Sequence, residues 1–123
     1  MNRILIVEDE ARIAGFINKG LKKEGFQTTI ASNGEEALQI LEDDSFDLLL
    51  LDIQLPIKDG WSVLEELRAQ KNLIPIIVVT ACYDVEDKIN KLPDQNIDYV
   101  CKPFQFAELL VQIKNILGLY CHT

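Results

Sequence analysis

Short apolar runs alternate with longer segments in which apolar residues recur at helical spacing along this chain. The short runs are rich in Leu, Ile and Val and are bounded by polar residues, a pattern typical of strands covered on both faces in a parallel sheet. With right-handed crossovers, this alternation predicts an α/β fold, a three-layer sandwich around a five-stranded parallel sheet. The predicted strands are residues 3–7, 27–31, 47–51, 75–80 and 97–101.

The segment after the first predicted strand has the apolar stripe of an amphipathic helix. Ile13, Phe16, Ile17 and Leu21 recur at helical spacing, and Gly25 follows them as a stop signal. We therefore expect this helix to lie on the sheet through the face that these four side chains share.

Four further helices are predicted between and after the other strands. Asn33 and Glu36 have the spacing of a capping box at the start of the second helix. The third covers residues 61–68, and the last covers residues 104–117. Residues 84–92 are the weakest predicted helix, because this segment is short, has few apolar positions and is closed by a proline.

Composition restricts the function classes without identifying one. The 123 residues are 48% hydrophobic, which suits a single domain over 1–123 that folds without disulfide staples. The formal net charge of -8 opposes direct binding to nucleic acid or to an anionic membrane surface. There is no pattern of a signal peptide or a membrane span. The three cysteines lie in no CxxC motif, so a reduced, cytoplasmic chain is the simplest expectation.

An acidic residue follows the third predicted strand directly, at the start of a loop. Asp52 follows an apolar run of four leucines, and Pro56 and Gly60 then interrupt the pattern before the third helix. Ligands of open α/β sheets bind at the carboxyl ends of the strands, where this acid lies. Taken alone, Asp52 is better interpreted as a solvated acid at a strand end, and the other residues decide between the two.

Polar side chains also follow the first, fourth and fifth strands. Parallel strands direct their carboxyl ends to one edge, and a flavodoxin-like strand order of 2-1-3-4-5 makes the first and third strands neighbours. Three carboxylates would then converge and would repel one another unless a cation neutralised them. Oxygen ligands backed by solvent favour Mg²⁺, whereas the alternative is an acidic rim without a metal. The residues at this edge are Glu8, Asp9, Asp52, Thr80 and Lys102.

Asp52 is the best candidate nucleophile of this group. A carboxylate can attack a phosphoryl group and form an acyl phosphate. Mg²⁺, the Lys102 ammonium and the Thr80 hydroxyl could then stabilise charge on the phosphoryl oxygens. The alternatives are a Thr80 that only packs in its strand and a Lys102 that is a solvated surface amine.

Two neighbours of Lys102 have open interpretations. Pro103 can form a cis bond that directs the lysine inward, or it can be an ordinary proline at a helix start. Tyr99 is either a packed aromatic or a side chain with a buried and an exposed position, and the residue chemistry alone favours packing.

The segments ILIVEDE, LLLLDIQLPIKDGW, IIVVTA and DYVCKPF resemble the receiver domain of response regulators in bacterial two-component signalling, in the same order along nearly the whole chain. Within that family, VEDEARIAGFINKGL and KPFQFAELL resemble the OmpR-like, winged-helix class. The resemblance implies that Asp52 accepts a phosphoryl group from a sensor histidine kinase or a phosphotransfer protein. It assigns Thr80 and Lys102 to the phosphoryl oxygens.

The resemblance also implies a metal set and a switch. Mg²⁺ would be bound by Asp9, Asp52 and the backbone carbonyl of Gln54, with Glu8 acting through water. Thr80 and Tyr99 would be the switch pair, which raises the two-position interpretation of Tyr99 above simple packing. Gln54 and Cys82 would flank the phosphoryl group and modulate its lifetime.

Phosphorylation would then alter the face formed by the fourth helix, fifth strand and fifth helix. OmpR-like regulators carry a DNA-binding domain after the receiver, so we expect either a stand-alone receiver or part of a longer transcription regulator. The loop PDQNID replaces a usual glycine-alanine pair, and Gln112, Lys114 and Gly118 stand where that class has arginines. Lys88, Asp98 and Glu108 could supply part of the charge set, so we expect a weaker or altered homodimer.

Three rival functions differ in chemistry from a receiver. A phosphatase of the haloacid dehalogenase type would need a second aspartate where Gln54 stands, so we expect no enzyme acting on external substrates. A flavodoxin-like cofactor binder would need a Ser/Thr/Gly-rich phosphate loop, whereas VEDEAR is acidic. A receiver-like interaction module that is never phosphorylated remains the main alternative.

Overall fold

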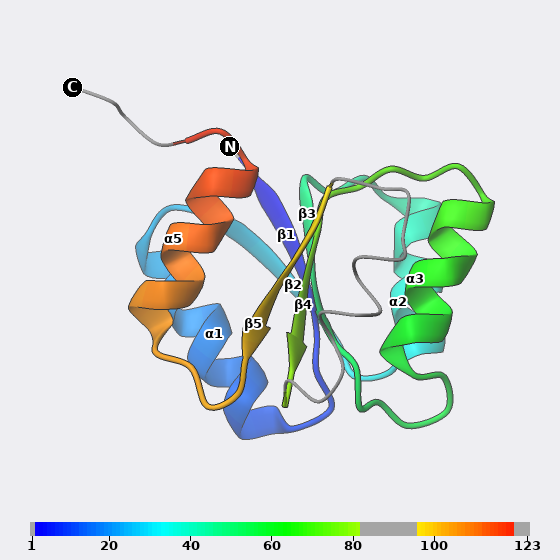
Figure 1. The fold of residues 1–123 in the computed structure, drawn as a ribbon, viewed down its shortest axis with the longest axis horizontal. Coiled ribbons are helices and arrows are strands. Elements are labelled where there is room, and N and C mark those ends of the chain that lie inside the picture. Colours follow the sequence, from blue (N-terminus) through cyan, green and yellow to red (C-terminus); the bar gives the residue numbers. More distant parts are fainter. Residues whose placement is uncertain (1, 82–95, 120–123) are drawn as a thin grey trace.

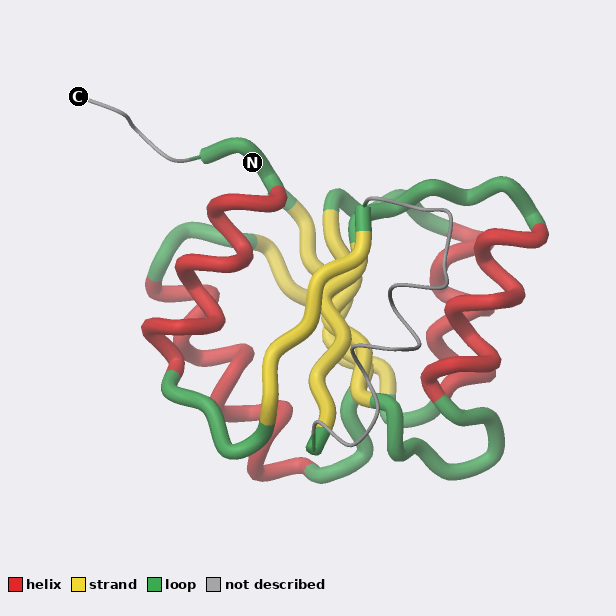
Figure 2. Tube along the Cα trace, viewed as in Figure 1, coloured by secondary structure: helices red, strands yellow, loops and turns green. Residues whose placement is uncertain are grey.

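A computed structural model describes residues 2–81 and 96–119 of the chain. The predicted α/β sandwich is confirmed, with one parallel sheet as the middle layer and helices on both faces (Figure 1, Figure 2). The predicted fourth helix and Cys82 lie outside the described residues.

The sheet has the expected strand order, β2-β1-β3-β4-β5, and the pairs are parallel. All five residues of β3 are buried, as the uninterrupted apolar run predicts for the central strand. The strand also extends one residue further than expected, so that Asp52 is its last residue. The strands are β1 (Arg3–Val7), β2 (Gln27–Ala31), β3 (Leu48–Asp52), β4 (Ile76–Thr80) and β5 (Ile97–Cys101).

The described helices form two layers, with α1 and α5 on one face of the sheet and α2 and α3 on the other (Figure 1). Alternate residues along each central strand pack against opposite helix layers. Leu49 and Leu51 pack toward α2 and α3, whereas Leu48 and Leu50 pack toward α1 and α5. The helices are α1 (Ala11–Lys23), α2 (Gly34–Asp43), α3 (Gly60–Ala69) and α5 (Phe106–Ile116).

The predicted cap of α2 is confirmed in its first half. Asn33 accepts a hydrogen bond from the Glu36 backbone N–H at 2.8 Å, which satisfies one of the unpaired donors of the first turn. The Glu36 carboxylate, however, accepts from the Ser32 N–H at 3.4 Å rather than from Asn33. The start of α2 is therefore fixed by a modified capping box.

The prediction that Phe16 lies on the buried face of α1 is wrong. Ile17 and Leu21 are buried, but Phe16 is 55% exposed and packs edge-on against Phe106, with ring centroids 6.0 Å apart. Phe106 also lies against Gly20, where an added Cβ would be 2.5 Å from its ring. The first turn of α5 therefore contacts α1 directly and leaves Phe16 at the margin of that contact.

None of the helices in residues 2–81 and 96–119 is long and apolar enough to cross a membrane.

Candidate functional site

The carboxyl ends of β1 and β3 bring three carboxylates together. Val7 pairs with Leu51 across these neighbouring strands, which places Glu8 and Asp9 beside Asp52. One oxygen from each acid lies within 4.8 Å of the others. Glu8 and Asp52 are 3% and 4% exposed, whereas Asp9 is exposed to solvent. The predicted convergence of the three acids is thus present.

Lys102 provides a positive charge beside these acids. Its Nζ lies 3.1 Å from Asp52 Oδ2 and 3.7 Å from Glu8 Oε2. Desolvation lowers the pKa of Lys102, but the charges of Asp52 and Glu8 outweigh it and raise the pKa overall. The lysine is therefore an ammonium at the site, and the Lys102–Pro103 peptide bond that follows is cis, one of the two predicted alternatives.

Burial raises the pKa of Glu8 to about 8, and the hydrogen bond and charge of Asp52 add to this effect while Lys102 opposes it. Within the described residues, Glu8 Oε1 is buried without a hydrogen-bond partner. A buried acceptor without a donor costs free energy, and a bound cation would remove this cost. The acid cluster therefore fits a hard divalent cation such as Mg²⁺ in donor type and in charge.

The loop between β3 and α3 wraps back onto Asp52. The Gln54 N–H donates to Asp52 Oδ1 at 3.1 Å, and the Gly60 N–H donates to the Ile53 carbonyl at 2.9 Å. A Cβ added at Gly60 would lie 2.4 Å from the Asp52 carbonyl oxygen, so only glycine permits this approach. Ile57, at the tip of the loop, has a φ of 70°, which strains a β-branched residue.

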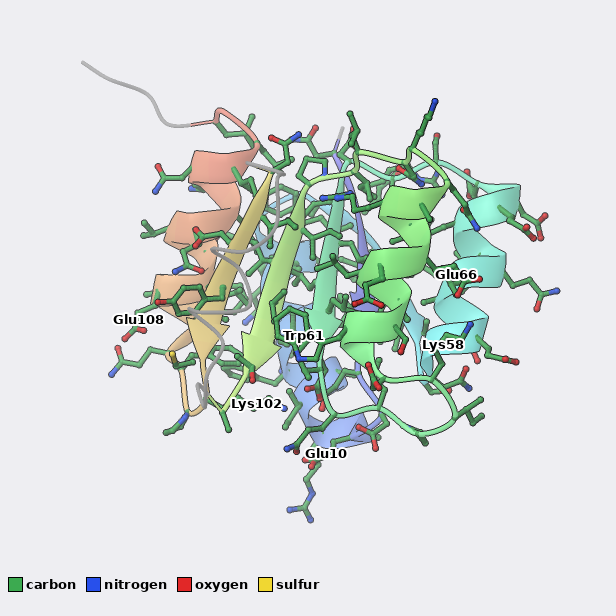
Figure 3. The ribbon with its side chains drawn as sticks, turned by 45° about the vertical axis from the view of Figure 1, so that its right-hand side comes forward. Glu10, Lys58, Trp61, Glu66, Lys102 and Glu108 are labelled. Carbon is green, nitrogen blue, oxygen red and sulfur yellow. The ribbon has the colours of Figure 1, made fainter. Side chains whose placement is uncertain are left out.

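Lys58 and Asp59 hold the same loop to the elements around it. Lys58 Nζ forms an ion pair with Glu66 Oε2 of α3 at 2.6 Å. Asp59 accepts a hydrogen bond from the Ser62 N–H at 2.9 Å and caps α3. Figure 3 shows Lys58 and Glu66 next to each other at α3, away from Lys102. The end of this loop next to α3 is thus anchored to that helix.

These groups surround a cavity of about 660 Å³ at the carboxyl edge of the sheet. It contains four of the predicted site residues and several that sequence reasoning missed. Trp61 and Glu10 could have been found only by their position beside recognised motifs, one directly after Gly60 and the other directly after Asp9. The lining residues are Asp9, Glu10, Asp52, Ile53, Gln54, Leu55, Asp59, Trp61 and Lys102.

Thr80 and Tyr99 lie on the neighbouring strands. Thr80 ends β4 opposite Cys101, and its carbonyl accepts a hydrogen bond from the Lys102 N–H at 2.6 Å. Tyr99 lies opposite Val78 and packs against the buried cluster on the α2 and α3 face. Thr80 therefore lies at the carboxyl edge of the sheet with Asp52. Tyr99 lies two residues before Cys101 in β5, further from that edge.

Two further expectations concern the surroundings of the site. Cys101 is disulfide-bonded, so the expectation that all cysteines are reduced is wrong for this residue. The predicted dimer face is described only in part. Asp98 accepts a hydrogen bond from the Tyr99 N–H at 2.8 Å, and Glu108 is exposed on α5, pointing away from the site in Figure 3.

Residues 4–114 match the family described as the response regulator receiver domain. The transcriptional regulatory protein PcoR of Escherichia coli is 38% identical over 117 residues, which are 95% of this chain and 52% of that protein. The transcriptional activator protein IrlR of Burkholderia pseudomallei is 42% identical over 115 residues, which are 94% of this chain and 50% of that protein. The chain thus spans about half the length of these curated relatives.

Solved receiver structures resemble the whole fold. The receiver domain of the Francisella response regulator 1452 superposes with a TM-score of 0.87 at 32% identity, covering 96% of this chain and 98% of that one. The Thermotoga maritima response regulator TrrA, solved in complex with Mg²⁺-BeF, gives a TM-score of 0.83 at 35% identity, covering 94% and 99%.

Proposed function

This chain belongs to the response regulator receiver domain family of two-component systems, and from that membership we propose that Asp52 accepts the phosphoryl group. The relatives are transcriptional regulators, in agreement with the expected OmpR-like class. The donor would be a sensor histidine kinase or a phosphotransfer protein.

One observation carries the proposal: the Asp52 carboxylate is almost fully buried, yet it lines an open cavity next to a cation and two other acids. Lys102 and the Gln54 N–H bind its oxygens and hold the carboxyl group in one orientation. A nucleophile held in place loses less freedom on reaching the transition state. No other acid among the described residues combines these features.

The transfer follows from this geometry. An Asp52 carboxylate oxygen attacks phosphorus, the bond from phosphorus to the donor nitrogen breaks, and the nitrogen keeps the electron pair. The Lys102 ammonium balances negative charge on the phosphoryl oxygens, and the Thr80 hydroxyl can donate a hydrogen bond to one of them. The product is an acyl phosphate on Asp52.

Mg²⁺ is the metal that suits this site. Asp9, Asp52 and the Gln54 carbonyl would hold it, and Glu8 would act through a water molecule. When bound, the ion supplies positive charge that offsets the repulsion between the carboxylates and the incoming phosphoryl group. The partnerless Glu8 oxygen and the excess of three acidic side chains over one ammonium support this assignment.

Thr80 and Tyr99 are proposed as the switch that reports phosphorylation. The Thr80 hydroxyl would move toward the phosphoryl group, and the Tyr99 ring would turn further inward. Such a change biases an existing equilibrium toward the active state of a protein contact face that includes β5 and α5. The face serves an altered homodimer or another protein contact, rather than direct nucleic-acid binding.

The remaining parts of the function concern the whole protein. We propose that residues 1–123 form one receiver domain, that it acts in the cytoplasm, and that the DNA-binding output of its relatives lies outside this segment. The domain assists only the phosphorylation and dephosphorylation of its own aspartate. It turns over no external substrate, because Gln54 supplies no acid or base beside Asp52.

Intact mass after incubation with acetyl phosphate and Mg²⁺ tests the proposal. We expect one phosphoryl group on the parent protein and none on Asp52→Ala or in the presence of EDTA. The matched control is Asp59→Asn, which alters a second acid of the same cavity but keeps a side chain able to cap α3. An adduct on Asp52→Ala, or none on a parent protein tested beside an active receiver, would reject Asp52 as the acceptor.

A further inference from the structure

Trp61 is the largest apolar side chain that lines the cavity around Asp52. It is the only tryptophan of the chain. Most of the other lining residues are acids, an amide or Lys102, all of which attract water. Beside the smaller apolar residues Ile53 and Leu55, the indole ring therefore gives one wall of a mostly hydrophilic cavity its largest apolar surface.

The position of Trp61 is fixed by the backbone of the acceptor itself. Gly60, directly before it, donates a hydrogen bond to the Ile53 carbonyl and lies against the Asp52 carbonyl oxygen. The Asp59 cap then sets the first turn of α3, which includes Trp61. The indole and the acceptor carboxylate are thus placed by the same short segment of chain.

The ring is only partly buried, although it also contacts the core. It packs against the buried cluster beneath α2 and α3, and Figure 3 shows it extending from α3 toward the sheet, on the side where Lys102 lies. One part of the ring thus contributes to packing. The part that lines the cavity is available to shape the space in which a phosphoryl group on Asp52 would reside.

We propose that Trp61 sets the lifetime of the phosphoryl group by excluding water from the α3 side of the cavity, an inference that rests on the proposed function. In hydrolysis, the oxygen of water bonds to phosphorus, the bond from phosphorus to Asp52 breaks, and Asp52 leaves as a carboxylate. Inorganic phosphate is released, and the proton of the water passes to phosphate or solvent. Fewer water molecules beside the phosphoryl group mean fewer productive attacks.

The decay of phosphorylated protein separates this role from simple packing. The protein is phosphorylated with acetyl phosphate and Mg²⁺, the donor is removed, and the loss of the phosphoryl group is followed by intact mass. We expect Trp61→Ala to shorten the lifetime at least about threefold and Trp61→Phe to restore much of it. The matched control is Val63→Ala, since Val63 is fully buried on the same helix but lies outside the cavity lining.

The outcomes either support or reject the proposal. A lifetime that is unchanged in Trp61→Ala, or shortened equally in Val63→Ala, rejects it. If Trp61→Ala does not fold, Trp61→Leu replaces it in the same comparison with the parent, with a shorter lifetime in Trp61→Leu as the supporting result. If the parent itself takes up no phosphoryl group, the proposed function fails instead, so the two failures are distinct.

Indole fluorescence gives a second readout that a packing role would not change. We expect Mg²⁺ with beryllium fluoride to shift the emission of Trp61 in the parent protein, because the indole would line the occupied cavity. The same reagents should leave the emission of Asp52→Ala unchanged. An identical response in both proteins, or no response in a parent protein whose binding of the reagents is seen by mass, rejects the proposal.

Discussion

The amino-terminal and carboxyl edges of the sheet differ in how completely their charged side chains are paired. At the amino-terminal edge, Arg3 donates two hydrogen bonds to Asp44, each 2.6 Å long, and its backbone N–H binds Asp47. The guanidinium also lies over the Phe46 ring, 4.7 Å from the centroid. Asp44 and Asp47 are therefore paired within the fold and need no further partner.

At the carboxyl edge, the acids that line the cavity outnumber the cations, and two acids of this edge, Glu8 and Asp52, are buried. Lys102 is the one lysine or arginine among the residues that line the described cavity, and it faces Asp52 and Glu8 together. A buried carboxylate that shares its cation with a second carboxylate is costly for the fold. The carboxyl edge, where the fold leaves charge uncompensated, is therefore the edge at which a cation or a phosphoryl group would find unpaired partners.

Removing the cation should have the largest effect on the carboxyl edge. We expect Lys102→Ala to lower the rate of phosphoryl uptake by about 10²- to 10³-fold, because the charge on the phosphoryl oxygens loses a preorganised partner. The rate from acetyl phosphate, measured by intact mass, checks this. Lys58→Ala is the control, since it removes a paired lysine near the same loop. Equal losses in the two variants would contradict the assigned role of Lys102.

Glu8 should make the stability of the metal-free protein depend on pH. Its pKa is raised to about 8 in the folded state, above the value near 4.5 of an unperturbed glutamate. The folded state therefore keeps a proton that the unfolded state has lost, so stability falls as the pH rises from about 4.5 through 8. We expect Glu8→Gln to remove this slope and to make the metal-free protein more stable than the parent at pH 8.

Denaturant unfolding in EDTA at pH 5.5 and pH 8.5 measures this effect. Mg²⁺ should oppose the loss in the parent protein, because the cation competes with the proton and binds only the folded state. If the metal-free parent protein is as stable as metal-free Glu8→Gln at pH 8.5, then Glu8 does not carry the uncompensated charge.

The ion pair of the amino-terminal edge should give the smallest effect. Its hydrogen bond to Arg3 lowers the pKa of Asp44 to about 2. Stability from this pair is present above pH 4 and is lost as the pH falls toward 2, the reverse direction to Glu8. We expect Asp44→Asn to reduce that acid loss slightly and to leave phosphoryl uptake unchanged, because the pair is exposed and distant from Asp52. Thermal unfolding between pH 2.5 and pH 5 measures the first effect.

Much of the fold could be predicted because its determinants are local. The apolar runs of β1 and β3 indicate strands, and a cap at Asn33 marks a helix start, all from neighbouring residues. Phe16 is wrongly predicted to face the sheet, because helical spacing shows which side of a helix is apolar but not how much of that side is covered. Whether a residue at the margin of that face is covered depends on Phe106, which is distant in the sequence.

The candidate site divides in the same manner. The order of acids and strands was sufficient to bring Glu8, Asp9 and Asp52 to one edge, because parallel strands share a direction. Converging acids are expected to raise one another's pKa, but the burial that contributes most to the raised pKa of Glu8 was not predictable. The position of Trp61 in the cavity wall was not predictable either. Both depend on how closely segments far apart in the chain approach, and desolvation and water exclusion arise only from that packing.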